Sequence, residues 1–196
     1  EFALRLAGTS YLEILKQGGG ILSSVKAVRE AELEQLVETT RRHVLTALTL
    51  GTTTLEIKSG YGLDTSIELK MLAAIGAVTK QTPLDVVATF LGAHAIPVEY
   101  RRDPDGFVTR VVDEMLPEVV EQGIARVCDV FCEEGVFSID QSRRILMAAK
   151  QLGLGLKIHA DEVHDLGGGG LAADLQAVSA DHLLAVSDAN VERLAR

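Results

Sequence analysis

The stretch Ala125–Glu162, which reads ARVCDVFCEEGVFSIDQSRRILMAAKQLGLGLKIHADE, contains the pattern that predicts the fold of this chain. Its two apolar runs, Ala125–Cys132 and Gly155–Ala160, have the length and composition of buried strands. Between them, Asp140–Leu152 repeats apolar residues at spacings of three and four, which is typical of an amphipathic helix. A strand–helix–strand unit of this kind predicts two parallel strands joined by a crossover helix.

The same alternation of strand and helix extends along most of the sequence. The predicted strands are Thr52–Lys58, Asp85–Gly92, Ala125–Cys132, Gly155–Ala160 and Val178–Leu183. The helical segments between them are Ser66–Lys80, Gly106–Gln122, Asp140–Leu152 and Leu171–Ala177. This order indicates an α/β fold in which helices cover a parallel sheet. The strand spacing fits either a doubly wound open sheet or a (β/α)8 barrel.

Local signals mark the ends of these helices. Residues suited to N-caps stand at three helix starts, namely Asp64 or Thr65, Ser138 or Asp140, and Ser187. Glycines suited to left-handed helix ends stand just before strands, at Gly51, Gly123 and Gly153.

The first fifty residues are predicted to be helical. One helix runs from Thr9 or Ser10 through Gln17, and a longer one runs from about Ser24 to Leu50. A helix in that place follows a strand in an α/β fold, yet the sequence has none before it. Five strands are also too few for an eight-stranded barrel. We therefore expect residues 1–196 to form one incomplete domain.

Composition argues against several classes of function. The formal net charge is -9 with no basic face, which disfavours nucleic-acid binding. No apolar run reaches the roughly 18 residues of a membrane span, and no signal peptide is predicted. Cys128 and Cys132 would lie roughly 13 Å apart on a strand, too far for a disulfide. Two thiols favour a reducing compartment, by default the cytoplasm.

Polar side chains gather at the carboxyl ends of the predicted strands, where parallel α/β folds build their active sites. They are Lys58–Tyr61, His94, Cys132–Glu134, His159 with Asp161 and Glu162, and Asp181 with His182. Histidines from separate strands and a carboxylate suit zinc or ferrous iron. The residues alone leave His94, His159 and His182 as candidate ligands.

Other polar features have simpler interpretations. Cys132 is expected to be a small core residue, His43 a surface residue and His164 a non-catalytic loop residue. The run Gly167–Gly170 opens a helix, where it could cradle an anion. We favour a structural turn, because neither a P-loop nor a GxGxxG motif is present.

Five blocks in order, GTTTLEIKSGYGLD, ATFLGAHAIPVEY, CDVFCEEGVFS, LKIHADE and SADHL, resemble the imidazolonepropionases. So does the opening EFALRLAGTSY with GGGILSSV, and the resemblance covers essentially the whole chain. The resemblance implies the amidohydrolase superfamily, with a distorted TIM barrel joined to a small β-sandwich. It implies strands two to six of that barrel, with the first strand, the last strands and the β-sandwich missing.

The resemblance also implies an activity and residue roles. The enzymes hydrolyse 4-imidazolone-5-propanoate to N-formimidoyl-L-glutamate in histidine degradation, with one divalent metal, zinc or iron. His159 matches the metal-binding histidine and His182 the histidine that shuttles a proton near the metal-bound water. Glu162 matches the carboxylate that contacts the imidazolone ring. Tyr11, Tyr61 and His94 match substrate-binding residues, His94 being suited to polarise the carbonyl.

The resemblance further implies that three of four metal ligands are missing: a His-x-His pair before residue 1 and an aspartate after residue 196. A carboxylate-binding arginine is missing as well, so this piece alone is expected to be inactive. Family members suggest a homodimer. Two alternatives stay open, a related amidohydrolase or deaminase acting on another nitrogen heterocycle, and an inactive, metal-free fragment.

Overall fold

The computed structural model describes residues 4, 6–8 and 21–196, so the helix predicted to end at Gln17 and the candidate Tyr11 lie outside the described residues. The strands are β1 (Thr54–Lys58), β2 (Asp85–Ala93), β3 (Val127–Cys132), β4 (Gly155–Ala160) and β5 (Ser179–His182). The helices are α3 (Ile21–Glu30), α4 (Leu33–Thr49), α5 (Thr65–Thr79), η1 (Val98–Tyr100), α6 (Pro104–Arg110), η2 (Val111–Met115), α7 (Leu116–Gln122), α8 (Ile139–Gln151), α9 (Gly168–Leu175) and α10 (Asp188–Leu194).

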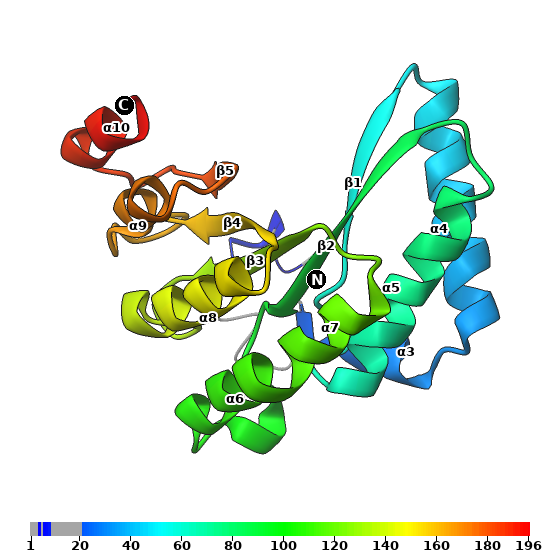
Figure 1. Cartoon of the computed structure of the whole chain (residues 1–196), viewed down its shortest axis with the longest axis horizontal. Coiled ribbons are helices and arrows are strands. Elements are labelled where there is room, and N and C mark those ends of the chain that lie inside the picture. The colour runs from blue at the N-terminus through cyan, green and yellow to red at the C-terminus, as the bar shows by residue number, and fades with distance from the viewer. Residues whose placement is uncertain (1–3, 5, 9–20) are drawn as a thin grey trace.

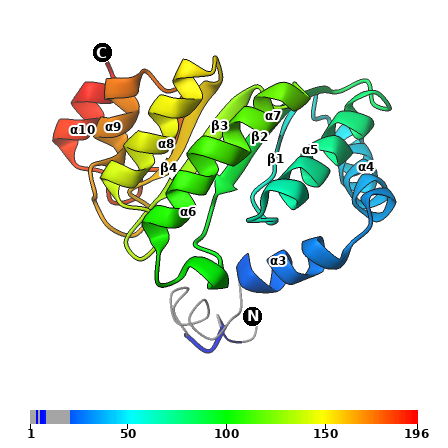
Figure 2. The ribbon, with the colours of Figure 1, turned by 60° about the horizontal axis from the view of Figure 1, so that its bottom comes forward.

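The five strands form one parallel sheet in the order in which they occur in the chain, β1-β2-β3-β4-β5. A doubly wound sheet reverses its strand order at a switch point, and this sheet does not. The sheet curls, and helices α5 to α9 lie along its outer side (Figures 1 and 2). The α/β prediction is confirmed, and the topology is that of a partial TIM barrel.

The hydrophobic core lies between the curled sheet and its outer helices. Its largest fully buried side chains are Phe90, Phe107, Phe137, Leu63, Leu72, Met115, Leu116, Ile145, Leu146, Ile158 and Leu171. Phe107 of α6 stacks on Phe137 with ring centroids 6.2 Å apart, which joins two neighbouring strand–helix units. Since apolar side chains fill this outer layer, the inner face of the sheet is left for polar residues.

Several predicted helix ends are confirmed. Asp64 caps α5 by accepting the Ser66 N–H at 3.0 Å, and Ser138 caps α8 by accepting the Gln141 N–H at 3.3 Å. Ser187 holds the N-cap position of α10 without a side-chain cap bond. The predicted helix-ending glycines have φ values of 91° (Gly51), 70° (Gly123) and 86° (Gly153).

The prediction of one helix from Ser24 to Leu50 is wrong, because the chain forms α3 and α4 with a break at Ala31 and Glu32. Glu32 has an extended backbone, and its N–H donates to the side chain of Gln35 at 2.9 Å, as in a capping box. The Lys70 ammonium donates to the Ala31 carbonyl at 2.6 Å, which satisfies an end of α3.

The long helical segment from Pro104 to Gln122 contains a π turn, η2, in its middle. Pro117 has no N–H to donate to the carbonyl four residues earlier, so the turn beside it widens, and the Leu116 N–H bonds to Val111 instead. Among the described helices, none is long and apolar enough to cross a membrane.

Strand β2 contains a bulge just before the residue expected to be functional. Phe90 pairs with Cys128 and Ala93 with Val130, so β2 has one more residue than β3 between these pairs. A bulge bends its strand and redirects the side chains that follow, here His94.

Candidate active site

Three histidines and a tyrosine lie in a row at the carboxyl edge of the sheet. Ring centroids are 5.1 Å apart for Tyr61 and His94, 6.1 Å for His94 and His159, and 5.2 Å for His159 and His182. Tyr61 and His94 follow β1 and β2, whereas His159 and His182 lie at the carboxyl ends of β4 and β5. Parallel strands bring these ends to one edge. The prediction that these residues meet is therefore supported by the geometry.

His94 lies mostly buried within this row. Its Nδ1 is 3.1 Å from the Gly60 carbonyl, so the ring donates there and presents Nε2 as the other nitrogen. Burial lowers the pKa of His94 to about 4, which keeps the ring neutral at pH 7.

His159 is oriented by a buried carboxylate. Its Nδ1 lies 3.1 Å from Oδ1 of Asp129, which is fully buried in the middle of β3. Burial alone would raise the pKa of Asp129, but the His159 hydrogen bond and the Lys58 ammonium hold that pKa below its ordinary value. Because Asp129 is an ionised acceptor, the His159 proton sits on Nδ1 and the lone pair on Nε2.

Alternating charges continue along the inner face of the sheet below His159. The Lys58 ammonium lies 2.8 Å from Asp129 and 2.9 Å from Asp181. Lys157 lies 2.6 Å from Glu56, which also accepts the Thr89 hydroxyl at 2.6 Å. Every one of these side chains is at most about a third exposed, so each charge is compensated by a neighbour rather than by water alone.

Asp129, His159 and Asp181 form a group of the size that a metal ion requires, with one ligand atom from each lying within 4.8 Å of the others. The Lys58 ammonium, however, already sits between the two carboxylates. A metal at that point would have to displace a cation with well-formed hydrogen bonds. The nitrogen better disposed to a metal is Nε2 of His159, on the opposite side of the ring from Asp129.

His182 and Glu162 form a second pair beside His159. Nε2 of His182 lies 3.5 Å from Oε2 of Glu162, longer than an ordinary hydrogen bond, and each side chain is about a third exposed. His182 has φ of 74° and Leu183 has φ of 57°, a left-handed conformation that costs free energy for non-glycine residues. The end of β5 is thus strained at the residue that faces His159.

Two buried carboxylates that the sequence analysis gave no role hold the neighbouring loops. Asp161 accepts the N–H groups of Leu166, Gly168 and Gly169 at 2.9–3.1 Å. Glu133 accepts the Val163 N–H at 2.9 Å and lies 2.9 Å from Nδ1 of His164. Both fix the backbone of the segment that follows Glu162.

The glycine run at the start of α9 has the structural role that we favoured. A Cβ on Gly168 would lie 2.7 Å from the Cβ of Ala160, so only glycine lets the helix approach β4 this closely. The N–H groups there point at the chain's own Asp161 carboxylate, which takes the place of an external anion.

The predictions for the two cysteines and for His43 also match the structure. Cys128 and Cys132 are free and buried, and burial raises the pKa of both thiols. His43 is exposed on α4. Sequence reasoning missed Asp129, the charge partner of His159, although a single acid inside an otherwise apolar strand was the available signal.

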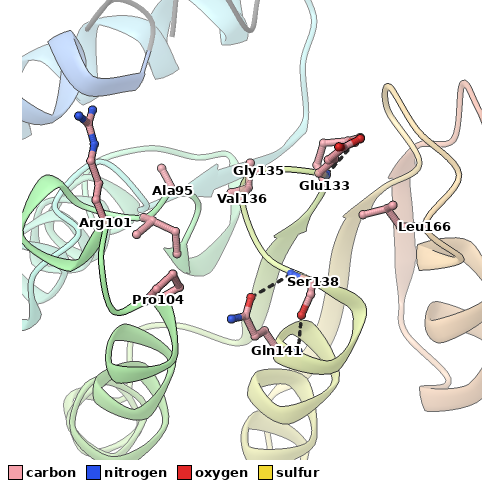
Figure 3. Close-up of a pocket in the computed structure, with 11 residues that line it drawn as sticks. Ala95, Arg101, Pro104, Glu133, Gly135, Val136, Ser138, Gln141 and Leu166 are labelled. Atoms are coloured by element: carbon pink, nitrogen blue, oxygen red, sulfur yellow. Dashed lines mark hydrogen bonds between the residues drawn. The ribbon is translucent and has the colours of Figure 1, made fainter. Parts of the chain in front are cut away.

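A cavity of about 680 Å³ is lined by none of the residues of the histidine row. Figure 3 shows residues of its wall. Its wall includes Arg101, Glu133, Ser138 and Leu166, from the loops that follow β2, β3 and β4, and Gln141 from the first turn of α8. Glu133 links this cavity to the histidine row, because it lines the cavity and also holds the backbone next to Glu162. Chemistry therefore identifies the candidate site better than the size of this cavity.

No protein-family profile matches the chain. Among curated proteins, it is 66% identical over 196 residues to an imidazolonepropionase of Desulfotalea psychrophila, covering all of this chain and 47% of that protein. It is 63% identical over 195 residues to the imidazolonepropionase of Syntrophobacter fumaroxidans and 52% identical over 195 residues to that of Bacillus velezensis, with 46% of each covered. The chain thus spans just under half the length of these relatives.

Proposed function

We propose, because this chain is homologous throughout its length to imidazolonepropionases, that it forms the central part of the catalytic domain of such an enzyme. The reaction is the hydrolysis of 4-imidazolone-5-propanoate to N-formimidoyl-L-glutamate, a step of histidine degradation. One observation carries the proposal beyond homology: the Asp129–His159 pair lies in a row with His94 and His182 at the carboxyl edge of a barrel sheet.

A single divalent metal, zinc or iron, fits the donor set around His159. The Nδ1 proton is committed to Asp129, so Nε2 has the lone pair that a metal needs. The remaining ligands would come from outside these 196 residues. When bound, such a metal lowers the pKa of water and polarises a carbonyl.

The substrate is held by the side chains at the other end of the row. Tyr61 contacts the imidazolone propanoate, and Tyr11, which lies outside the described residues, keeps the substrate-binding role that the resemblance implies. Neutral His94, whose Nδ1 donates to Gly60, presents Nε2 as an acceptor, which suits an N–H of the ring better than its carbonyl. Glu162 contacts the imidazolone ring.

His182 transfers the proton during hydrolysis. It takes a proton from the attacking water and delivers it to the ring nitrogen as the C–N bond breaks, which balances the reaction. Glu162, 3.5 Å away, stabilises the charged imidazole between these two transfers.

We also propose the domain organisation, partner, compartment and assembly of the enzyme. Residues 1–196 are one portion of a single barrel domain, and the partner is a small molecule. Two buried free thiols suit the cytoplasm. A homodimer is the expected assembly. The alternative of a deaminase acting on another ring is not favoured, since the relatives quoted above share the imidazolonepropionase name.

The test is turnover by the full-length protein, purified with its metal, against imidazolonepropanoate and a panel of other cyclic amides and nitrogen heterocycles. Formation of formimidoylglutamate with a clear preference for imidazolonepropanoate supports the proposal. Hydrolysis of another ring with no activity on imidazolonepropanoate would refute it.

Replacing Asp129 with Asn is expected to weaken metal binding by about 10–100-fold, because the metal-binding histidine loses its charged partner. The amide still accepts the His159 hydrogen bond, but Lys58 loses one of its two close carboxylates. Chelator competition measures the affinity. Asp85→Asn is the matched control, since Asp85 is exposed at the opposite end of the same sheet. An Asp129→Asn protein with the affinity of the wild type would contradict the assignment.

A further inference from the structure

The loop between β1 and α5 carries Tyr61 between two glycines, yet its backbone is held on both sides by buried or half-buried side chains. Gly60 has φ of 103°, and a Cβ there would lie 2.7 Å from the Leu91 carbonyl oxygen. Leu63 has φ of 51°, a left-handed conformation that a leucine adopts only when its surroundings impose it. The loop backbone is therefore held in an unfavourable conformation, which requires contacts from neighbouring side chains.

The first of these side chains is Glu68, a fully buried carboxylate in the first turn of α5. It accepts the N–H groups of Gly60 at 2.8 Å, Gly62 at 2.7 Å and Leu63 at 2.9 Å. Burial raises the pKa of Glu68, while hydrogen bonds from Ser59 and these N–H groups oppose that rise. A buried carboxylate is costly unless such donors surround it, so the loop and Glu68 stabilise each other.

The second of these side chains is Arg29 of α3, which binds the carbonyl side of the same loop. Its Nε donates to the Gly62 carbonyl at 2.8 Å and its Nη2 to the Leu63 carbonyl at 3.4 Å. The third guanidinium nitrogen donates to Glu99 at 2.8 Å, which anchors the side chain at its outer end. Arg29 thus binds carbonyl groups, and Glu68 binds N–H groups, of the same short segment.

This segment contains one proposed substrate-binding residue, Tyr61, and contacts another, His94. The Gly60 carbonyl accepts the Nδ1 proton of His94, and the His94 ring packs edge-on against Tyr61. A shift of this backbone would move the tyrosine and remove the bond that sets the His94 tautomer. Glu68 and Arg29 bind the backbone of the loop, so both would act on the histidine row through the loop.

We propose that Glu68 and Arg29 are positioning residues that form a clamp on the loop Ser59–Asp64 and fix Tyr61 and His94 for substrate binding. This inference rests on the proposed function for its kinetic part. Its structural part, the order of the loop, is independent of any activity.

Glu68→Gln is the sharpest test, because it keeps the size of the side chain but turns one acceptor oxygen into a donor that faces an N–H group. In the full-length protein, hydrogen exchange at Gly60, Gly62 and Leu63 is expected to rise at least about tenfold. The value of kcat/KM is expected to fall by about 10²-fold with metal content unchanged, since misplacement of a positioning group by an ångström costs about that much.

Arg29→Gln provides a second variant, because Arg29 is partly exposed and its loss does not leave a buried charge. The expected effects are the same in kind and smaller, about tenfold in kcat/KM. If Glu68→Gln fails to fold, Arg29→Gln decides. Glu38→Gln on exposed α4 makes the same chemical change as Glu68→Gln far from the loop and should alter neither readout.

A double-mutant cycle separates positioning from general stability. If the clamp acts through Tyr61, the losses of kcat/KM caused by Glu68→Gln and Tyr61→Phe should not multiply. Once Glu68→Gln has misplaced the tyrosine, removing its hydroxyl should have little further effect. Fully multiplicative losses, or unchanged exchange in both clamp variants, would overturn the inference. A wild-type protein that leaves imidazolonepropanoate intact would refute the proposed function, while the exchange measurement would still decide whether the clamp holds the loop.

Discussion

Replacing His159 with Asn is expected to remove the bound metal from the full-length protein and to lower kcat/KM for imidazolonepropanoate by at least about 10³-fold. Asparagine places its amide nitrogen close to the position of Nδ1 in histidine. The bond to Asp129 is therefore retained, and the Nε2 ligand atom alone is lost. Because the metal supplies several kcal/mol of catalysis in hydrolases of this kind, a loss of three orders of magnitude is a lower bound.

The measurement pairs elemental analysis of the purified protein with steady-state kinetics. His43→Asn is the matched control, since His43 is exposed on α4, and it should retain both metal and rate. A His159→Asn protein that keeps a full complement of metal would show that the ion binds elsewhere. The group of Asp129 and Asp181 around Lys58 would then be the place to look.

The sequence was sufficient for the α/β class and for the place of the site. Apolar runs alternating with helical segments leave little choice but a parallel sheet, and parallel strands end at one edge. His94, His159 and His182 lie at or just after the carboxyl ends of three different strands, so their meeting was predictable from the sequence. Strand order is a tertiary property, and the choice between a barrel and a doubly wound sheet needed either the family resemblance or the structure.

Residues that organise the site were harder to predict, because their partners are distant in sequence. Asp129 lies 30 residues before His159, and nothing local shows that the two side chains share a face. Glu68 has the sequence appearance of a solvated charge, yet backbone N–H groups surround it in the fold. The break between α3 and α4 was missed for a similar reason, since an EAE segment has high helix propensity and the Lys70 contact is tertiary.

Replacing His182 with Asn is expected to lower kcat by about 10²–10⁴-fold while the metal stays bound. The size of the effect is that of losing a general acid–base group. Asn is preferred over Ala because the residue has φ of 74°, a region that asparagine tolerates better than most residues. The backbone at the end of β5 should thus remain in place, and the loss can be assigned to the imidazole.

The distinguishing result is the contrast between the two histidine variants. His159→Asn should lose metal and rate together, whereas His182→Asn should lose rate alone, because the rings are 5.2 Å apart but only His159 has its Nδ1 bonded to Asp129. Glu162→Gln gives the companion measurement, with a smaller fall in kcat if the carboxylate only stabilises the charged His182. A His182→Asn enzyme with unaltered kcat would remove His182 from the proton path and leave Glu162 as the nearest remaining side chain able to carry the proton.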